Sequence, residues 1–122
     1  MAKHIQREGM EQEALFQWAN MMSAKFPALK MLYHIPNGGT RNKLEAACLK
    51  RQGVKAGVPD IHLPVPAGKF HSLYIELKAG NNKPTKEQIE WIENLRRQGN
   101  AAEVCVGWIQ AAELIEKYLK LK

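Results

Sequence analysis

The chain has few of the features that mark several large protein classes. It contains two cysteines, Cys48 and Cys105, in no C-x-x-C or Cys/His spacing. This pattern indicates neither a zinc site nor a disulfide framework, and it favours two small buried apolar residues. No apolar stretch approaches the roughly 20 residues that cross a bilayer, and the N-terminal residues lead into no secretory segment. We therefore expect a cytoplasmic protein without a membrane partner.

Acidic residues are scarce relative to basic ones. The 122 residues include 18 Lys and Arg but 12 Asp and Glu, which gives a formal net charge of +6. Such an excess favours polyanionic partners such as nucleic acid. Hydrophobic residues make up 45% and charged residues 25%, a balance typical of globular proteins. At this length we expect one domain over residues 1–122.

The first half of the chain predicts two helices with a strand between them. Apolar residues recur at helical spacing from about residue 9 to residue 26, and Pro27 supplies the stop. The short apolar run at 31–35 predicts a strand that enters a loop. A second helix is expected around residues 43–52.

The middle of the chain predicts an antiparallel hairpin. Apolar residues alternate after Asp60, which indicates a strand, and two prolines make this strand short or place it at an edge. After a turn, residues 70–79 form the second and clearer strand. His62 and His71 are interpreted as strand residues rather than ligands.

The last part of the chain predicts helix, strand and helix. Thr85 and Gln88 have the spacing of a capping box, which opens a helix. The expected core-facing residues of this helix are Ile89, Ile92 and Leu95. A strand at 101–106 and a helix at about 109–121 follow. Because a helix connects the last two strands, we expect a parallel crossover in a mixed sheet flanked by helices, an α/β fold.

A group of charged residues lies where a buried strand is expected. Glu76 and Lys78 interrupt the apolar run 73–79, and alternation along a strand places both on one face. Asp60 on the neighbouring strand adds a second carboxylate. Two carboxylates at one place form an oxygen-rich pocket of the kind that holds Mg²⁺ or Mn²⁺. The pattern points to metal-assisted hydrolysis.

These residues also carry a family resemblance. Pro59-Asp60 and Glu76-Leu77-Lys78 resemble the PD-(D/E)xK nuclease signature. Four segments occur in order along the chain: HIPNGG at 34–39, GVKAGVPD at 53–60, IELK at 75–78 and QxxW at 88–91. Together they resemble the VRR-NUC family in its small stand-alone form, which is typical of phages and bacteria. The resemblance covers about residues 8–119.

The resemblance implies a fold, an activity and partners. The fold would be a restriction-endonuclease-like α/β core with a mixed β-sheet flanked by helices. The activity would be cleavage of DNA phosphodiester bonds that depends on Mg²⁺ or Mn²⁺. Some relatives act on branched DNA as dimers, which implies structure-selective cutting of branched or four-way junction DNA by a homodimer. The location would be the cytoplasm of a bacterium or of a phage-infected host cell.

The roles implied for the central residues follow from the same resemblance. Asp60 and Glu76 would bind the metal ion, with the Leu77 carbonyl as a third ligand. Lys78 would either orient and deprotonate the attacking water or neutralise charge in the transition state. Gln88 either serves only the capping box or also hydrogen-bonds the water or a phosphate.

The first helix offers an additional acid of the kind that such nucleases place there. Glu11 lies four residues before Leu15 and continues the apolar stripe inward, so we favour it as a further ligand. Glu8 lies one turn earlier on the same side and remains an alternative, whereas Glu13 points away. These acids would otherwise only complement the helix dipole.

Residues of the glycine-containing loop and nearby cations are candidates for contact with the DNA backbone. They are His34, Asn37, Gly38, Arg41 and Lys55. Glycines let a phosphate approach main-chain N–H groups, and basic residues add salt-sensitive attraction. No base-reading motif is present, which favours recognition of shape. Two alternatives stay open: a non-catalytic nucleic-acid-binding module with the same fold, and an enzyme that acts on RNA.

Overall fold

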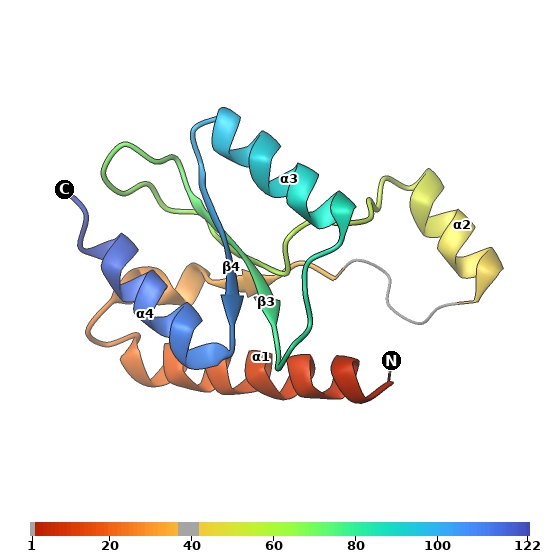
Figure 1. The fold of residues 1–122 in the computed structure, drawn as a ribbon. Coiled ribbons are helices and arrows are strands. Elements are labelled where there is room, and N and C mark those ends of the chain that lie inside the picture. The colour runs from red at the N-terminus through yellow and green to blue at the C-terminus, as the bar shows by residue number, and fades with distance from the viewer. Residues whose placement is uncertain (1, 37–41) are drawn as a thin grey trace.

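The described residues of the chain form a four-stranded mixed sheet with helices on both sides (Figure 1). The computed structural model describes residues 2–36 and 42–122, with side chains for residues 7–36 and 42–122. The elements are, in order, α1 (Ala2–Met22), the 3₁₀ helix η1 (Pro27–Met31), β1 (Tyr33–His34), α2 (Lys43–Arg51), β2 (Ile61–Leu63), β3 (Leu73–Lys78), α3 (Lys86–Arg97), β4 (Ala101–Val106) and α4 (Trp108–Leu119).

The strands follow the order β1-β2-β3-β4 across the sheet. The β2–β3 pair is antiparallel, with Ile61 opposite Ile75, which confirms the predicted hairpin. The β3–β4 pair is parallel, with α3 as the connection, which confirms the predicted crossover. β2 is as short as its prolines indicate, but it lies between β1 and β3 rather than at an edge. Pro64 follows β2, so it removes no hydrogen bond from the ladder.

The start of the chain differs from the prediction. α1 begins at Ala2 and ends at Met22, whereas the apolar spacing predicts 9–26. The residues before Gly9 are mostly polar, so the periodicity does not mark them although they form helix readily. Pro27 is the first residue of η1, a position that suits its fixed φ and missing N–H. η1 also occupies part of the run predicted as strand, which leaves two residues for β1.

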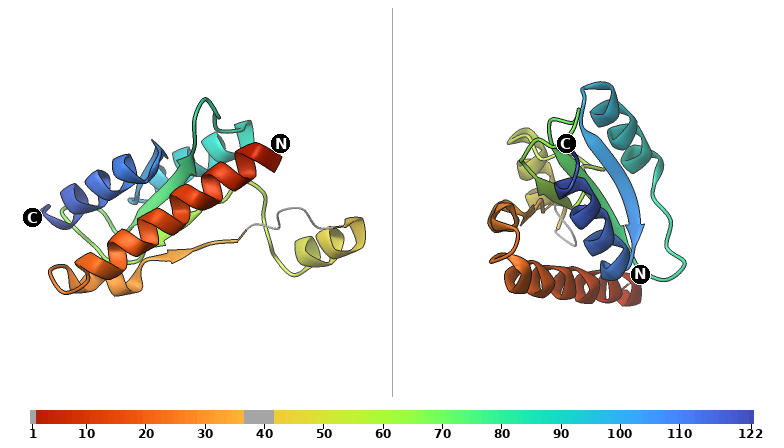
Figure 2. Two further views of the ribbon diagram at one scale, coloured as in Figure 1. Left: turned by 90° about the horizontal axis from the view of Figure 1, so that it is seen from below. Right: turned by 90° about the vertical axis from the view of Figure 1, so that its left-hand side faces the viewer.

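The core lies between the sheet and the pair α1 and α4, which pack against each other and against β3. Figure 2 shows α4 and α3 on opposite sides of the sheet. The apolar side chains of β3 alternate toward the core, and they are Leu73, Ile75 and Leu77. Tyr74, Glu76 and Lys78 therefore point to the opposite face, on the side of α3. This alternation separates the core from the charged residues.

The two remaining helices contribute unequally to packing. α3 packs on β4 and buries Ile92, as predicted, but Ile89 is 43% exposed, so its expected core position is wrong. α2 stands apart from the rest of the chain (Figures 1 and 2). None of the residues within α2 is buried, and Leu44 is 84% exposed. In the described part of the chain, no helix is both long and apolar enough to cross a membrane.

Candidate active site

The structure brings Asp60, Glu76 and Lys78 together. Continuing the β2–β3 register by one residue places Asp60 directly opposite Glu76. Asp60 Oδ2 accepts a hydrogen bond of 2.9 Å from the Leu77 N–H, which fixes the aspartate against β3. Lys78 Nζ lies 3.3 Å from Glu76 Oε2. The grouping expected from strand alternation is therefore present, with two carboxylates and one ammonium on the same face.

Burial makes this group unusual. Glu76 is 1% exposed and Lys78 5% exposed. Glu76 Oε2 pairs with Lys78, but Glu76 Oε1 has no hydrogen-bond partner among the described residues. A buried polar atom without a partner costs about 1–3 kcal/mol, and more when it is charged. Such an atom in a native fold is typical of a site that binds something.

The electrostatics of Glu76 support the same interpretation. Burial raises the pKa of Glu76 to about 8, because removal from water disfavours the carboxylate. The facing Asp60 carboxylate raises this pKa further, and the Lys78 ammonium opposes both effects. Burial and the facing carboxylate thus both disfavour a negative charge on Glu76, and a cation beside the two acids offsets this cost.

The main chain supplies a further oxygen. In the continued register Pro59 lies opposite Leu77, and a proline has no N–H to donate. The Leu77 carbonyl therefore lacks its ladder partner from the neighbouring strand. Carboxylate and carbonyl oxygens are the ligands that Mg²⁺ and Mn²⁺ prefer. In the part of the chain that is described, no group of three or more His, Cys, Asp or Glu side chains is placed to hold an ion. The two carboxylates and this carbonyl are therefore only candidate donors.

The acids of α1 lie near the end of β3 and have partners of their own. Glu11 Oε1 accepts a hydrogen bond of 2.8 Å from the Trp108 N–H and so caps α4, whose preceding residue is Gly107. The Gly107 N–H in turn donates to the Lys78 carbonyl. Glu8 Oε2 accepts a hydrogen bond from Asn82 Nδ2. Glu11 is thus close in the fold to the strand that carries the site, and in this structure it acts as a helix cap.

Gln88 forms the capping box that the sequence predicts. Its N–H donates to Thr85 Oγ1 at 3.2 Å, and its Oε1 accepts from the Thr85 N–H at 2.8 Å. The side-chain oxygen of Gln88 is therefore engaged at the start of α3. A role of Gln88 in positioning water or phosphate would use its amide nitrogen.

Two residues to which the sequence assigns no role, Trp91 and Gly57, fix the segment before Asp60. Trp91 Nε1 donates a hydrogen bond of 3.0 Å to the Ala56 carbonyl. Gly57 has a φ of +88°, and a Cβ at this position would lie 2.8 Å from the carbonyl carbon of Glu87. Only a glycine lets the segment pass this close to α3. Gly57 belongs to the sequence segment GVPD and Trp91 to the segment QxxW. The occurrence of both segments is the signal in the sequence for this contact.

This close approach predicts a destabilising substitution. Gly57→Ala adds backbone strain and a clash, so we expect a loss of about 2–4 kcal/mol and a fall of about 5–15 °C in Tm, measured by thermal unfolding. Gly53→Ala is the matched control, because Gly53 also has a positive φ but meets open space within the described structure. Equal Tm values for the two variants would show that the contact with Glu87 does not matter.

The structure describes two of the five residues that are candidates for contact with nucleic acid. His34 Nδ1 lies 2.9 Å from the Asp60 carbonyl oxygen, so this exposed histidine adjoins the site. Lys55 is exposed on the segment that leads to Asp60. The other three candidates lie outside the described residues: Asn37, Gly38 and Arg41.

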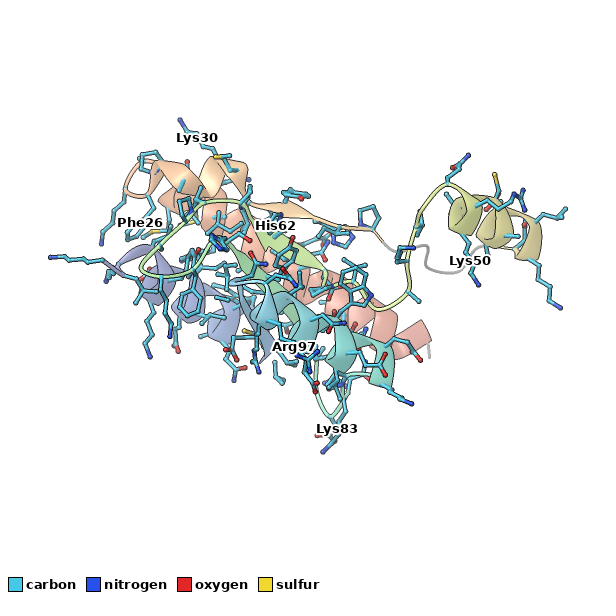
Figure 3. All side chains as sticks on the ribbon, turned by 90° about the horizontal axis from the view of Figure 1, so that it is seen from above. Phe26, Lys30, Lys50, His62, Lys83 and Arg97 are labelled. Atoms are coloured by element: carbon cyan, nitrogen blue, oxygen red, sulfur yellow. The ribbon has the colours of Figure 1, made fainter. Side chains whose placement is uncertain are left out.

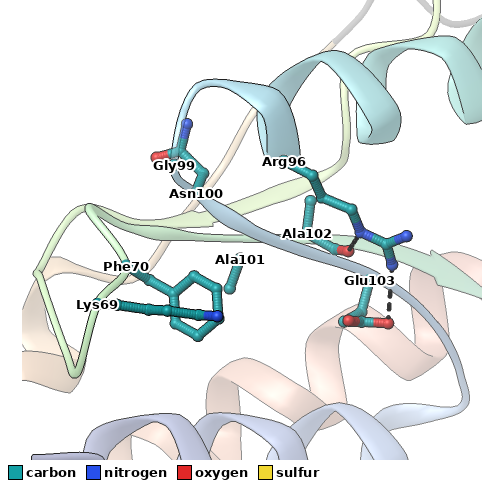
Figure 4. A pocket seen from close by; sticks show the side chains of 8 residues that line it. All are labelled: Lys69, Phe70, Arg96, Gly99, Asn100, Ala101, Ala102 and Glu103. Atoms are coloured by element: carbon teal, nitrogen blue, oxygen red, sulfur yellow. Dashed lines mark hydrogen bonds and ion pairs between the residues drawn. The ribbon is translucent and has the colours of Figure 1, made fainter.

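A separate pocket of about 320 Å³ lies at the start of β4, away from this group (Figure 4). Its lining residues are Lys69, Phe70, Arg96, Gly99, Asn100, Ala101, Ala102 and Glu103. The Arg96 guanidinium lies 3.1 Å from Glu103 Oε1, so its charge is already paired.

Comparisons with known proteins identify the family of the chain. The family model of the VRR-NUC domain matches residues 2–108. A solved structure described as a VRR_NUC domain protein has 35% sequence identity and a TM-score of 0.81, and the match covers 94% of this chain and 89% of that chain. No curated protein matches. The likeness confirms the expected restriction-endonuclease-like α/β fold. The chain belongs to the VRR-NUC domain family and therefore forms a nuclease-type domain.

Proposed function

We propose that this protein is a metal-dependent nuclease that hydrolyses DNA phosphodiester bonds and prefers branched or junction DNA. The observation that carries the proposal is the buried Glu76 opposite Asp60, with one carboxylate oxygen left without a partner among the described residues. A merely structural ion pair with Lys78 would not need the second carboxylate. Membership of a nuclease-type family and the net charge of +6 support the same function.

The donor set suits Mg²⁺ or Mn²⁺. Asp60, Glu76 and the Leu77 carbonyl would hold the ion, and Glu11 would join only by releasing the Trp108 N–H. The ion, when bound, supplies a Lewis acid and lowers the pKa of water. Asp60 keeps its second oxygen available, because Oδ2 is the atom that accepts from the Leu77 N–H.

Lys78 would act beside these acids. Its Nζ lies 3.3 Å from Glu76 Oε2, on the same face of the sheet as Asp60. Of the two roles considered, neutralising charge on the transition state fits this arrangement better, because a paired ammonium is a poor base. Deprotonation of water by Lys78 would first require the ammonium to give up a proton, because only the neutral amine can accept one. Gln88 would position the water or a phosphate oxygen through its amide nitrogen.

The path of the substrate would run over the exposed residues next to the site. His34 and Lys55 flank Asp60 along the chain and in the sheet, and Asn37, Gly38 and Arg41 would extend the contact. Contacts to phosphates position a strand without reading its bases, which suits selection by shape. Cutting both strands of a junction requires two active sites and therefore favours a homodimer.

Removal of divalent metal should abolish cutting. We expect wild-type protein to cleave nicked, flapped or four-way DNA in Mg²⁺ or Mn²⁺, to cleave linear duplex less, and to cleave nothing in excess chelator, with products mapped at nucleotide resolution on gels. RNA of the same sequence tests the choice of sugar, and sedimentation tests the dimer.

Two outcomes would contradict the proposal. Cutting that persists undiminished in chelator would exclude a metal-dependent reaction. Binding of all these substrates without cleavage in either metal would identify a non-catalytic nucleic-acid-binding module instead.

A further inference from the structure

Three aromatic side chains lie side by side across β1, β2 and β3. Tyr33 on β1 lies opposite His62 on β2, and His62 lies opposite Tyr74 on β3. The rings of His62 and Tyr74 are stacked, with centroids 4.0 Å apart and planes 15° apart. Tyr33 meets His62 edge to face at 5.4 Å. We call these three residues the aromatic row.

Hydrogen bonds fix the aromatic row in one arrangement. The Ser72 hydroxyl donates to Asn100 Oδ1 at 2.7 Å, so His62 Nε2, 3.1 Å from Ser72 Oγ, must be the donor of that bond. A neutral His62 then accepts at Nδ1 from the Tyr33 hydroxyl at 2.9 Å. The tyrosine ring is therefore held in place by the protein before any ligand arrives.

The same hydrogen-bond directions show that Ser72 is not an activated nucleophile. An activated serine must give its proton to the histidine, whereas Ser72 gives its proton to Asn100. Ser72 is also buried. The histidine therefore orients Tyr33 and does not serve a second catalytic centre.

Tyr33 offers its ring to solvent. The residue is 46% exposed on an edge strand, while its hydroxyl is directed at His62. A preoriented, half-exposed ring is a suitable surface for stacking, because little conformational entropy is lost when a ligand binds.

The aromatic row lies next to the candidate active site. His62 is two residues after Asp60, and Tyr74 is two residues before Glu76, on the same face of the sheet. A two-residue step along a strand is about 7 Å and neighbouring strands are about 5 Å apart, so Tyr33 lies within reach of a few nucleotides from Asp60. Figure 3 shows the side chains of the molecule seen from above, with His62 of the aromatic row labelled.

We propose that Tyr33 stacks on an unpaired nucleobase of the strand that enters the site. The proposal rests on the proposed nuclease function, because it takes the acids Asp60 and Glu76 as the place where that strand is bound. Bases inside a duplex are already stacked and cannot reach the ring, so the aromatic row selects DNA with a single-stranded segment beside the cut. Stacking on an aromatic side chain is sequence-tolerant, which agrees with a chain that lacks a base-reading motif.

The test is binding of single-stranded DNA that contains the fluorescent base 2-aminopurine, in chelator. Stacking on Tyr33 quenches the fluorescence in wild type and in Tyr33→Phe. We expect Tyr33→Ala and Tyr33→Leu to lose the quenching and to bind about 5- to 100-fold more weakly. Ile109→Ala is the matched control, because Ile109 is an exposed apolar residue on α4. Duplex DNA should bind all variants alike.

Tyr33→Leu keeps the bulk of the side chain, so wild-type quenching in a folded Tyr33→Leu would overturn the proposal. Equal weakening on duplex DNA would also overturn it, because that result indicates loss of a general contact. An RNA strand with the same fluorescent base shows whether the base comes from DNA or RNA. The experiment needs no metal and no cleavage, so its outcome is independent of whether the protein is a nuclease.

Discussion

Asp60→Asn and Glu76→Gln should each reduce metal-dependent DNA cutting by about 10³-fold or more, because several kcal/mol of transition-state stabilisation by the ion would be lost. Both substitutions remove a charged ligand and keep nearly the same shape. The asparagine can still accept from the Leu77 N–H, which preserves the local fold. The measurement is the initial cleavage rate on the best branched substrate in Mg²⁺ and in Mn²⁺.

The control is Glu113→Gln, which removes an exposed acid on α4. This variant should cut at the wild-type rate. All three variants should bind DNA in chelator at least as tightly as the wild type does, because the acids repel phosphate and supply no attraction to it. Cleavage within a few-fold of wild type by both site variants would remove Asp60 and Glu76 from the mechanism.

The second large effect concerns stability and pH. The folded protein raises the pKa of Glu76 to about 8, from an ordinary value of 4.5. Between these pH values the folded state keeps a proton that the unfolded state has released, so the free energy of unfolding should fall as pH rises. The limiting slope is about 1.4 kcal/mol per pH unit, and it vanishes above the folded pKa. Urea unfolding at pH 5–9 without metal measures it.

Glu76→Gln is the variant that isolates this effect. It keeps the hydrogen-bonding shape of a neutral Glu76 and cannot ionise, so its stability should lack this component of the slope and should exceed that of wild type at pH 8–9. Mn²⁺ should raise the Tm of wild type more at pH 8 than at pH 6, because binding must displace the proton. It should leave the Tm of Glu76→Gln unchanged. Parallel pH profiles for the two proteins would contradict the assigned pKa.

Local sequence signals predicted the part of the fold that carries the site. The alternation around Asp60 and Glu76 gave the hairpin, and the spacing of Thr85 and Gln88 gave the start of α3. These features depend on neighbouring residues, which is why a single sequence suffices. The placement of both acids and Lys78 on one face follows from the two-residue period of a strand.

Features that depend on tertiary contacts could not be predicted in this way. Pro27 is compatible both with the end of one helix and with the start of another. In the structure it starts η1, in which Leu29 is buried. Ile89 follows the helical period of α3, yet α3 packs on β4 and leaves that residue exposed. The capping of α4 by Glu11 connects residues 97 positions apart. No periodicity in the sequence contains such a pairing.

Pro59 shows how a residue can be selected for its main chain rather than its side chain. In a regular strand pair, the carbonyl oxygens that face the partner strand accept its N–H groups and are not available to an external ligand. Opposite Leu77, the proline leaves one carbonyl free without opening the sheet to water, because its own ring is fully buried. Every other amino acid carries an N–H that would close this gap. The vacancy in the ladder is therefore a property that only proline can supply.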